Sequence, residues 1–577
     1  MAERDTTLAT TVRLSPALAR AAREGAALDC DVLVIGGGVN GTGVARDCAL
    51  RGLRVRLYEK HDFAFGASGN SSGMVHGGVR YLTTHPEVTA QSCLDSGFIQ
   101  SIAPHLVFRI PFVFPIRKRR GDRIVEAALD AFFAAYDRYQ PLKRGKRHNR
   151  LSADEALALE PTLAPAMRGA ITFDEWGIDG ARLCVLNALD AERHGGHVHN
   201  HHEVVGLLRD EAALAAGTPS AVRGVIVRDR LTGRRESVTA RLVVNATGAW
   251  GPVTAKLGGA SLRLRPGKGI HVFYERRLSN YGVVVTAVDG RQIFVMPWGN
   301  MSMIGTTDDD YFGDLDDVRP TSDEVRYLVE SVEHYVPSAK GARIIGTTTG
   351  VRPTIYAYGK TEDSLSREHE IIDHTKDGLP GLFSMIGGKL ASYRLFAEEM
   401  SDVVAATLGH DARSKTHLQP LPGGERVPES APLATQHELP EPLVRRLVER
   451  HGTLTEDVLD AARVRPELRA VTCRCECVLE AEVRWACRHE HVRTVSDLSR
   501  RTRLGLGSCG GQQCALRAAQ VVAEENGYPA SEAPTLAASF LVERYRFRAP
   551  TLDGAQARSE ELLAARMAWS GLLGRAR

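Results

Sequence analysis

The sequence lacks any uninterrupted run of about 18 apolar residues, the length that a membrane-spanning helix requires. We therefore expect no transmembrane segment. The first residues, 1–28, scatter Arg and Glu among alanines and contain no apolar core like that of a secretory signal. We interpret this stretch as an N-terminal extension and expect a cytoplasmic protein.

A large excess of charge of one sign is also missing. The sequence carries 73 Lys and Arg against 70 Asp and Glu, a net charge of +3. This balance is too mild to indicate nucleic-acid binding. A hydrophobic share of 43% is ordinary for a globular protein, and 577 residues exceed what one core can hold, so we expect two to four domains.

The cysteines are few and unevenly placed. Of the ten, four are scattered through the first 184 residues and six lie between positions 473 and 514. In a reducing compartment, ligation of a metal or cluster is favoured over disulfides. The crowded region is therefore a candidate ligand site.

The stretch from Asp31 to Lys60 contains the strongest pattern. An apolar run is followed by GGGVNG at 36–41, a helix-compatible segment and a second apolar run that ends at Glu59. The order strand, glycine turn, helix, strand is that of a dinucleotide-binding βαβ unit. FAD and NAD both fit it, and the alternative is a tight turn without a ligand.

Within this unit, the glycines of the turn and the final glutamate each have a physical role. Gly36 permits the tight turn, Gly38 lets the backbone approach a pyrophosphate, and Gly41 lets the helix pack closely. Asn40 lies in the same turn. Glu59 is placed where a carboxylate accepts hydrogen bonds from a ribose.

Further glycine-rich stretches follow. Residues 65–82 are rich in Gly and Ser, including Ser71, Ser72 and Gly73, which indicates backbone packed around a flat or charged ligand, the alternative being a flexible loop. The run LVVNATGAWG places Gly248 and Trp250 at a second turn that leaves a strand. Strand-like runs then predict a β-rich region at about 263–347.

Residues 98–150 form a basic amphipathic segment. A helix-like pattern of apolar residues is flanked by two Lys/Arg groups, one of which contains Lys143. Such a helix suits a protein that rests on an anionic membrane surface, here the inner face of the cell membrane. The alternative is a helix packed on its own core between solvated charges.

The C-terminal part divides into three regions. Residues 415–442 hold six prolines and lack periodicity, which predicts a linker. A helical region at 443–525 contains the crowded cysteines, in a small domain at about 471–525. A helical tail is predicted for 526–577.

Taken in order, six motifs resemble those of the FAD-dependent glycerol-3-phosphate dehydrogenases. They are IGGGVNG, SSGMVHGGVRYL, NATGAW, MIGTTD, GVRP and GGKLASYR. The resemblance implies an α/β fold in which a glutathione-reductase-like, FAD-binding Rossmann domain is interleaved with a β-rich substrate domain over 29–414. A helical C-terminal region with an iron–sulfur domain would follow, because the cysteine-bearing tail is similar to that of the anaerobic type of these dehydrogenases.

The resemblance also implies the substrate residues. Arg80 and Arg352 match positions that bind the substrate phosphate, for which guanidinium groups are well suited. Tyr81 is a further substrate-binding candidate. His271 is the leading general base, because a neutral imidazole accepts a proton near pH 7, and Lys389 is the rival base. On the flavin side, Lys389 would stabilise the reduced anion.

The motif GGKLASYR supplies further cofactor contacts. Gly388, Lys389 and Leu390 match the family's cofactor positions. The sequence departs from the family at Ala391, where many relatives carry Thr. The loss of that hydroxyl puts the contacts near it in doubt.

The crowded cysteines resemble a bacterioferritin-associated ferredoxin-like domain. The implied ligands of a [2Fe–2S] cluster are Cys473, Cys475, Cys509 and Cys514. Four thiolates also suit tetrahedral zinc, which is the alternative. Cys477 and Cys487 are interpreted as non-ligands, with Cys477 as a substitute for one ligand.

The resulting hypothesis is an enzyme that oxidises sn-glycerol 3-phosphate to dihydroxyacetone phosphate with FAD. Its electrons would pass through the cluster to a quinone-linked redox partner, since a cluster carries one electron at a time. The alternatives are an oxidase that uses O₂, a catalytically silent electron-transfer or redox-sensing flavoprotein, and an enzyme for another small hydroxy or amino acid.

Overall fold

The computed structural model describes residues 28–79, 82–83, 86–118, 122–209, 220–356 and 369–569. The chain forms two compact units, and each is assembled from three separate segments. The first unit takes 1–68, 183–267 and 352–419, and the second takes the remainder. None of the described helices is long and apolar enough to cross a membrane.

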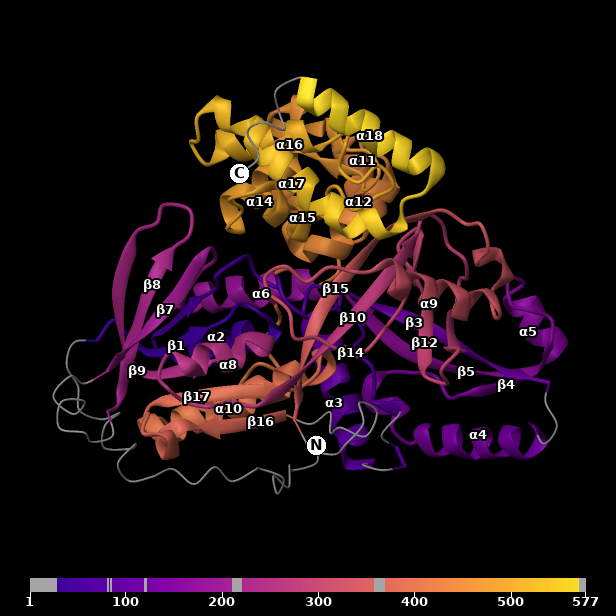
Figure 1. The fold of residues 1–577 in the computed structure, drawn as a ribbon, viewed down its shortest axis with the longest axis horizontal. Helices are drawn as coiled ribbons and strands as arrows, with labels where there is room; N and C mark the ends of the chain where they lie inside the picture. The colour runs from indigo at the N-terminus through magenta and orange to yellow at the C-terminus, as the bar shows by residue number, and fades with distance from the viewer. Residues whose placement is uncertain are drawn as a thin grey trace. The chain divides into compact units, whose positions relative to one another are not determined.

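The first unit contains a mixed sheet with the strand order β16-β17-β9-β1-β2-β6 (Figure 1). The inner pairs are parallel, and β16 is antiparallel to β17. A hairpin, β7 and β8, extends from β9. The strands are β1 (Cys30–Ile35), β2 (Val55–Tyr58), β6 (His197–His199), β7 (His202–Arg209), β8 (Val222–Asp229), β9 (Arg235–Asn245), β16 (His369–Asp373) and β17 (Leu382–Gly387).

Strand β1 lies between two parallel neighbours, and its continuous apolar run reflects that position. Val32, Leu33 and Val34 are fully buried, as expected for a parallel strand covered on both faces. Figure 1 shows helices beside this sheet. They are α2 (Val39–Leu50), α6 (Gly180–Arg193), α8 (Gly251–Lys256) and α10 (Tyr393–Leu408).

The second unit contains a nine-stranded sheet in the order β14-β10-β13-β12-β11-β3-β5-β4, with β15 paired to β10. Most of its pairs are antiparallel, whereas β11 and β3 are parallel. The strands are β3 (Val107–Arg117), β4 (Asn149–Ser152), β5 (Met167–Ile178), β10 (Leu264–Tyr274), β11 (Gly282–Thr286), β12 (Gln292–Trp298), β13 (Met301–Gly305), β14 (Asp309–Asp310) and β15 (Ile344–Ile355).

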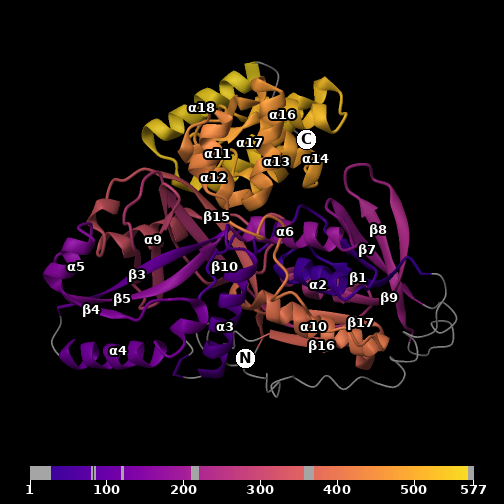
Figure 2. The same ribbon diagram turned by 180° about the vertical axis from the view of Figure 1, so that it is seen from behind.

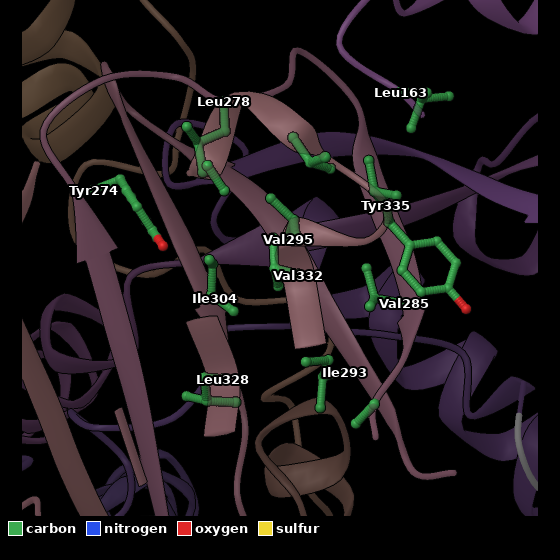
Figure 3. Close-up of a cluster of buried hydrophobic side chains, with 14 of the residues drawn as sticks. Leu163, Tyr274, Leu278, Val285, Ile293, Val295, Ile304, Leu328, Val332 and Tyr335 are labelled. Atoms are coloured by element: carbon green, nitrogen blue, oxygen red, sulfur yellow. The ribbon is translucent and has the colours of Figure 1, made fainter. Parts of the chain in front are cut away.

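An apolar cluster between this sheet and α9 (Ser322–Glu333) forms one core of the second unit. Figure 3 shows Leu328 and Val332 of the helix beside Val295 and Ile304 of the strands. A capping box at Thr321, whose hydroxyl accepts from the backbone N–H of Glu324, fixes where the helix begins.

The sheet extends beyond the β-rich region predicted at 263–347, because β3, β4 and β5 come from residues 107–178. Strand β3 pairs with β5 along nearly its whole length. Such pairing depends on residues far apart in the chain, which local patterns do not show. Three helices accompany these strands, namely α3 (Pro86–Ile102), α4 (Asp122–Tyr136) and α5 (Ala153–Leu159).

Helix α4 occupies the predicted amphipathic segment. Phe133 and Tyr136 are buried in a core cluster with Phe112 and Phe173, so this apolar face packs on the protein itself. Lys143, counted in the sequence as a flanking surface charge, is completely buried. These contacts favour the alternative of a helix packed on its own core.

The stretch predicted as a linker, 415–442, is structured instead. Leu421 is fully buried, Gly424 lies against the backbone of Ile102, and 430–437 form a helix. Pro432 and Pro442 lie in the first turns of the helices 430–437 and 441–451, a position that proline tolerates. Beyond them the helices gather together (Figure 2). They are α11 (Ser430–His437), α12 (Glu441–His451), α13 (Thr455–Val464), α14 (Glu480–His489), α15 (Val495–Thr502), α16 (Ala515–Glu525), α17 (Ala533–Arg548) and α18 (Gly554–Trp569). Strands β18 (Val471–Cys473) and β19 (Val478–Leu479) precede α14.

Candidate active site

The glycine turn of the first unit leaves no space for larger residues. A Cβ on Gly36 would lie 2.7 Å from the carbonyl oxygen of Ala246, and one on Gly41 only 2.0 Å from the carbonyl oxygen of Gly36. Gly36 also has a φ of +109°. The backbone is therefore packed as a nucleotide-binding turn requires.

Gly38 behaves differently from its neighbours. It has an extended conformation before α2, and a Cβ there would meet only Ser68 Oγ, at 3.3 Å. The N-cap residue of α2, Gly38, has no side chain with which to cap the helix. The first turn of this helix therefore presents backbone N–H groups and a positive dipole end, which favour phosphate.

Glu59 holds the turn from the next strand. One of its oxygens accepts from the N–H of Gly37 at 2.6 Å, and the other accepts from the N–H of His61 at 2.8 Å. A carboxylate has further lone pairs, so these bonds leave it able to accept a ribose hydroxyl. Ser68 Oγ accepts from the N–H of Val39 at 3.0 Å and supports the start of the helix.

The later motifs of the first unit come to the same region of that unit. A Cβ on Gly248 would lie 3.9 Å from Pro353, which follows Arg352, and a Cβ on Gly388 would lie 3.7 Å from Nδ2 of Asn40. Lys389 begins the short 3₁₀ turn 390–392, which contains Leu390. Three distant motifs and the glycine turn are thus brought together.

Trp250 and Asn245 complete this region. The ammonium group of Lys60 lies 4.8 Å from the centre of the Trp250 ring. Asn245 donates to Gly251 and Ser384 and accepts from Thr247, which ties the NATGAW turn to β17.

The buried amide oxygen of Asn40 has no hydrogen-bond partner within the described residues. Such an atom is costly unless a ligand or water completes it. Together with the glycine at the N-cap of α2 and the close glycines, it fits a bound nucleotide such as FAD.

His271 and Ser72 meet in the second unit. Nε2 of His271 lies 2.8 Å from Oγ of Ser72, and the His271 side chain is almost completely buried. Its ring packs against Gly305, where a Cβ would lie 2.3 Å from Cδ2. The strand pairing of β10 and β13 sets these two residues opposite each other.

The segment after Ser72 is bound to β5. Ile178 donates to the carbonyl of Gly73 at 2.6 Å, and Met74 forms a bridge with Gly177. Gly73 has a φ of +60°, and Ser71 Oγ accepts from its N–H. The predicted substrate residues Arg80 and Tyr81 lie outside the described residues.

The four predicted ligand cysteines form two neighbouring pairs. The side chains of Cys473 and Cys514 interact, which lowers the pKa of Cys473 to about 6 and raises that of Cys514. The Cys514 thiol donates to the carbonyl of Gly511 at 3.6 Å. Partial burial raises the pKa of Cys475, whose side chain also interacts with that of Cys509. Four thiols together are a donor set for a cluster or zinc.

The other two crowded cysteines stand apart from these pairs. Cys477 is exposed, and its thiol donates to the carbonyl of Arg474. Burial raises the pKa of the Cys487 thiol to about 12. In the described part of the chain, no three His, Cys, Asp or Glu side chains form a ready-made metal site.

Several supporting residues were not predicted. Ser68 lies within the Gly- and Ser-rich stretch and Asn245 within NATGAW, so their motifs signal them. The buried pair of Lys143 and Glu175 carries no such signal, because a lysine in a basic group predicts a surface residue.

Comparison with known proteins identifies the family. Residues 31–394 match the family model described as FAD dependent oxidoreductase, and residues 414–533 match the C-terminal domain of alpha-glycerophosphate oxidase. One chain of the anaerobic glycerol-3-phosphate dehydrogenase of Escherichia coli (strain K12) is 34% identical over 548 residues, covering 94% of this chain and 97% of its own length. The chain belongs to the FAD-dependent glycerol-3-phosphate dehydrogenase family.

Other members of the family give the same picture. The corresponding chain of an anaerobic glycerol-3-phosphate dehydrogenase of Haloferax volcanii is 33% identical over 86% of this chain and 83% of its own length. Glycerol-3-phosphate dehydrogenase 1 of Mycobacterium bovis is 35% identical over 84% of this chain and 92% of its own length.

A solved structure of the family confirms the predicted α/β fold. The FAD complex of the Bacillus halodurans glycerol-3-phosphate dehydrogenase has a TM-score of 0.73 at 25% identity, and the match covers 91% of this chain and 96% of that one. The L-alpha-glycerophosphate oxidase of Mycoplasma pneumoniae has a TM-score of 0.51 at 20% identity over 68% of this chain and 98% of that one, which shows the fold alone. FAD is the cofactor of this family, and the glycine turn of the first unit fits it.

Proposed function

We propose that the protein is an FAD-dependent sn-glycerol-3-phosphate dehydrogenase that produces dihydroxyacetone phosphate. The observation that carries this proposal is the match to glycerol-3-phosphate dehydrogenase chains over both the FAD region and the C-terminal region. When bound, FAD supplies the acceptor for the hydride from C2 of the substrate.

The protein's own residues have separate tasks in this proposal. Arg80 and Arg352 bind the phosphate dianion, and Tyr81 adds a polar contact. His271 takes the proton of the C2 hydroxyl, while Ser72, whose Oγ lies 2.8 Å from Nε2, orients the ring. Lys389 supplies positive charge where the flavin becomes anionic, and it is the alternative base.

The flavin contacts also remain proposals. In the first unit, Gly36, Gly38, Asn40, Gly41 and Glu59 hold the adenine nucleotide half of FAD. The remaining contacts are assigned to Ser71, Ser72, Gly73, Gly248, Trp250, Gly388, Lys389 and Leu390.

We also propose a [2Fe–2S] cluster on Cys473, Cys475, Cys509 and Cys514. The two thiol pairs in the loops around β18 and α16 support this donor set, and zinc is the alternative occupant. When bound, the cluster would pass electrons singly to a redox partner that is linked to a quinone.

Peripheral association with the inner face of the cell membrane belongs to the same proposal. Lys118, Arg144, Lys146 and Arg147 are exposed near α4, although Lys143 is not. Co-sedimentation with anionic and with neutral vesicles tests it, and equal binding to both would contradict a role for these charges.

An anaerobic titration of the purified protein with glycerol 3-phosphate tests the central proposal. We expect bleaching of the oxidised flavin and an EPR signal from a reduced cluster, both complete at about 1.5 equivalents because the flavin takes two electrons and the cluster one, with about two irons per chain. An unbleached flavin would contradict the dehydrogenase. Bleaching with one zinc and no iron would replace the cluster by zinc.

The oxidase alternative has a separate readout. In aerated buffer without an added acceptor, an oxidase yields one hydrogen peroxide per turnover. We expect peroxide formation to be slow compared with turnover in the presence of a quinone analogue.

A further inference from the structure

A completely buried ion pair lies beneath the loop that follows Ser72. Nζ of Lys143 is 2.6 Å from Oε2 of Glu175, and the two side chains are 0% and 2% exposed. Lys143 also donates to the hydroxyl of Tyr136 at 2.9 Å and to the carbonyl of Asp174 at 2.7 Å. The hydroxyl of Tyr136 in turn donates to Oε1 of Glu175 at 2.7 Å.

The Glu175 carboxylate of this network also contacts the backbone of the loop. Oε2 of Glu175 accepts the N–H of Gly77 at 3.0 Å. A Cβ on Gly77 would lie 2.3 Å from both Cys93 Sγ and the Tyr136 hydroxyl, so the backbone sits directly on the network. The carboxylate therefore bonds a cation, a phenol and a main-chain N–H at once.

Three side chains of helix α3 also hold this loop. Ser96 donates to the carbonyl of Val75 at 2.7 Å, Cys93 donates to the carbonyl of Gly77 at 3.5 Å, and Thr89 donates to the carbonyl of Gly78 at 3.1 Å. Four side chains thus fix the main chain between 75 and 78. The loop continues directly into Arg80, the proposed phosphate ligand.

A buried ion pair is a weak source of stability, because desolvation of both charges offsets their attraction. A burial this complete is better explained by what the pair orients. Lys143 and Tyr136 hold the Glu175 carboxylate in one orientation, and only an oriented carboxylate can fix the Gly77 N–H.

We propose that Glu175, held by Lys143 and Tyr136, is a positioning residue for the loop 75–78, which leads to the proposed phosphate ligand Arg80. It acts through the Gly77 backbone and touches neither substrate nor flavin. This inference rests on the proposed role of Arg80 in the function above.

The test measures binding and hydride transfer separately in the FAD-loaded protein. Stopped-flow reduction of the flavin gives an apparent Kd for glycerol 3-phosphate and a limiting rate. Inorganic phosphate, as a competitive inhibitor, gives an inhibition constant that does not depend on chemistry. We expect Glu175→Gln to raise both constants about tenfold and to change the limiting rate by less than threefold.

Two further variants separate positioning from stability. Lys143→Met/Glu175→Leu removes both charges and should keep a melting temperature near that of the wild type, yet leave the Kd raised, because Gly77 has lost its acceptor. Tyr136→Phe keeps the Gly77 bond and should raise the Kd only about twofold. The matched control, Glu330→Gln on the exposed side of α9, should change nothing.

Each other result has a definite meaning. An unchanged Kd in Glu175→Gln, or a double variant that regains both stability and affinity, would overturn the positioning role. Arg80→Gln is measured in parallel. If Arg80→Gln leaves the Kd unchanged, Arg80 does not bind the phosphate. A raised Kd in Glu175→Gln would then show that Glu175 does not act through Arg80.

Discussion

Oγ of Ser72 and Nε2 of His271 lie 2.8 Å apart, although the two residues are nearly 200 positions apart in the chain. The contact joins the Gly- and Ser-rich stretch to the strand that carries the leading candidate for the base. It gives the imidazole a fixed orientation in which Nε2 faces the serine hydroxyl.

The first prediction concerns this contact. His271→Ala should slow flavin reduction by a factor on the order of 10² to 10⁴, the usual contribution of a general base. Ser72→Ala should slow it about tenfold, because the ring remains but loses its partner. Single-turnover stopped-flow kinetics measure both, with Ser559→Ala on α18 as a control.

A full rate in His271→Ala would contradict the assignment. Lys389→Ala would then be the variant to compare. A pH profile of the limiting rate distinguishes the two candidates, because loss of the base should remove one ionisation from the profile.

The second prediction separates packing of the turn from contact with the cofactor. At Gly38 the backbone tolerates a side chain, and its Cβ would meet only a flexible hydroxyl, so Gly38→Ala should fold normally yet lose FAD. At Gly41 the added Cβ meets a carbonyl oxygen at 2.0 Å, so Gly41→Ala should lose both FAD and stability.

The ratio of flavin to protein absorbance and the melting temperature of the apoprotein measure these effects. If Gly38→Ala retains full FAD content, the backbone at 38 does not approach the cofactor.

The third prediction concerns the cysteines. Serine at any of the four paired positions, for example Cys473→Ser, should lower iron per chain to below half and weaken the cluster EPR signal. Cys477→Ser and Cys487→Ser should retain both, because these thiols stand apart from the pairs. Equal losses in all variants would contradict the assignment.

The fourth prediction concerns acid stability. Burial lowers the pKa of His105 to about 3, and neither ring nitrogen has a partner in the described chain. As the pH falls below about 6.5, His105 therefore binds a proton in the unfolded chain but not in the folded protein. The stabilisation by the neutral ring is complete above pH 6.5 and is lost as the pH falls toward 3, at up to about 1.4 kcal/mol per pH unit.

His105→Gln should remove this dependence. Melting temperatures of the two proteins between pH 7.5 and 5 measure it, and the wild type should lose more on acidification. Parallel curves would show that His105 does not contribute.

The sequence predicted the elements whose signal is local. The glycine turn with its flanking strands, the FAD cofactor and the family followed from short motifs, and the structure confirms the βαβ unit around Gly36 and Gly41. The residues of 98–150 were harder to place, since an apolar helix with basic flanks fits a membrane surface and a protein core equally well.

What the sequence could not predict depends on long-range pairing. Strand β3 joins the nine-stranded sheet only because β5 and β11 lie on either side of it. Lys143 is buried only because Glu175, on β5, neutralises it. The prolines of 415–442 were interpreted as breaks, whereas Leu421 and α11 pack into the fold.

The division of each unit into three stretches of chain has a consequence for biosynthesis. Strand β1 is made first, yet its neighbour β9 ends at Asn245, and β17 on the far side of β9 ends only at Gly387. The sheet around β1 therefore stays incomplete until more than half of the polypeptide has left the ribosome. Neither unit can be cut out as a single fragment, so a minimal flavin-binding version would have to be spliced from separate pieces.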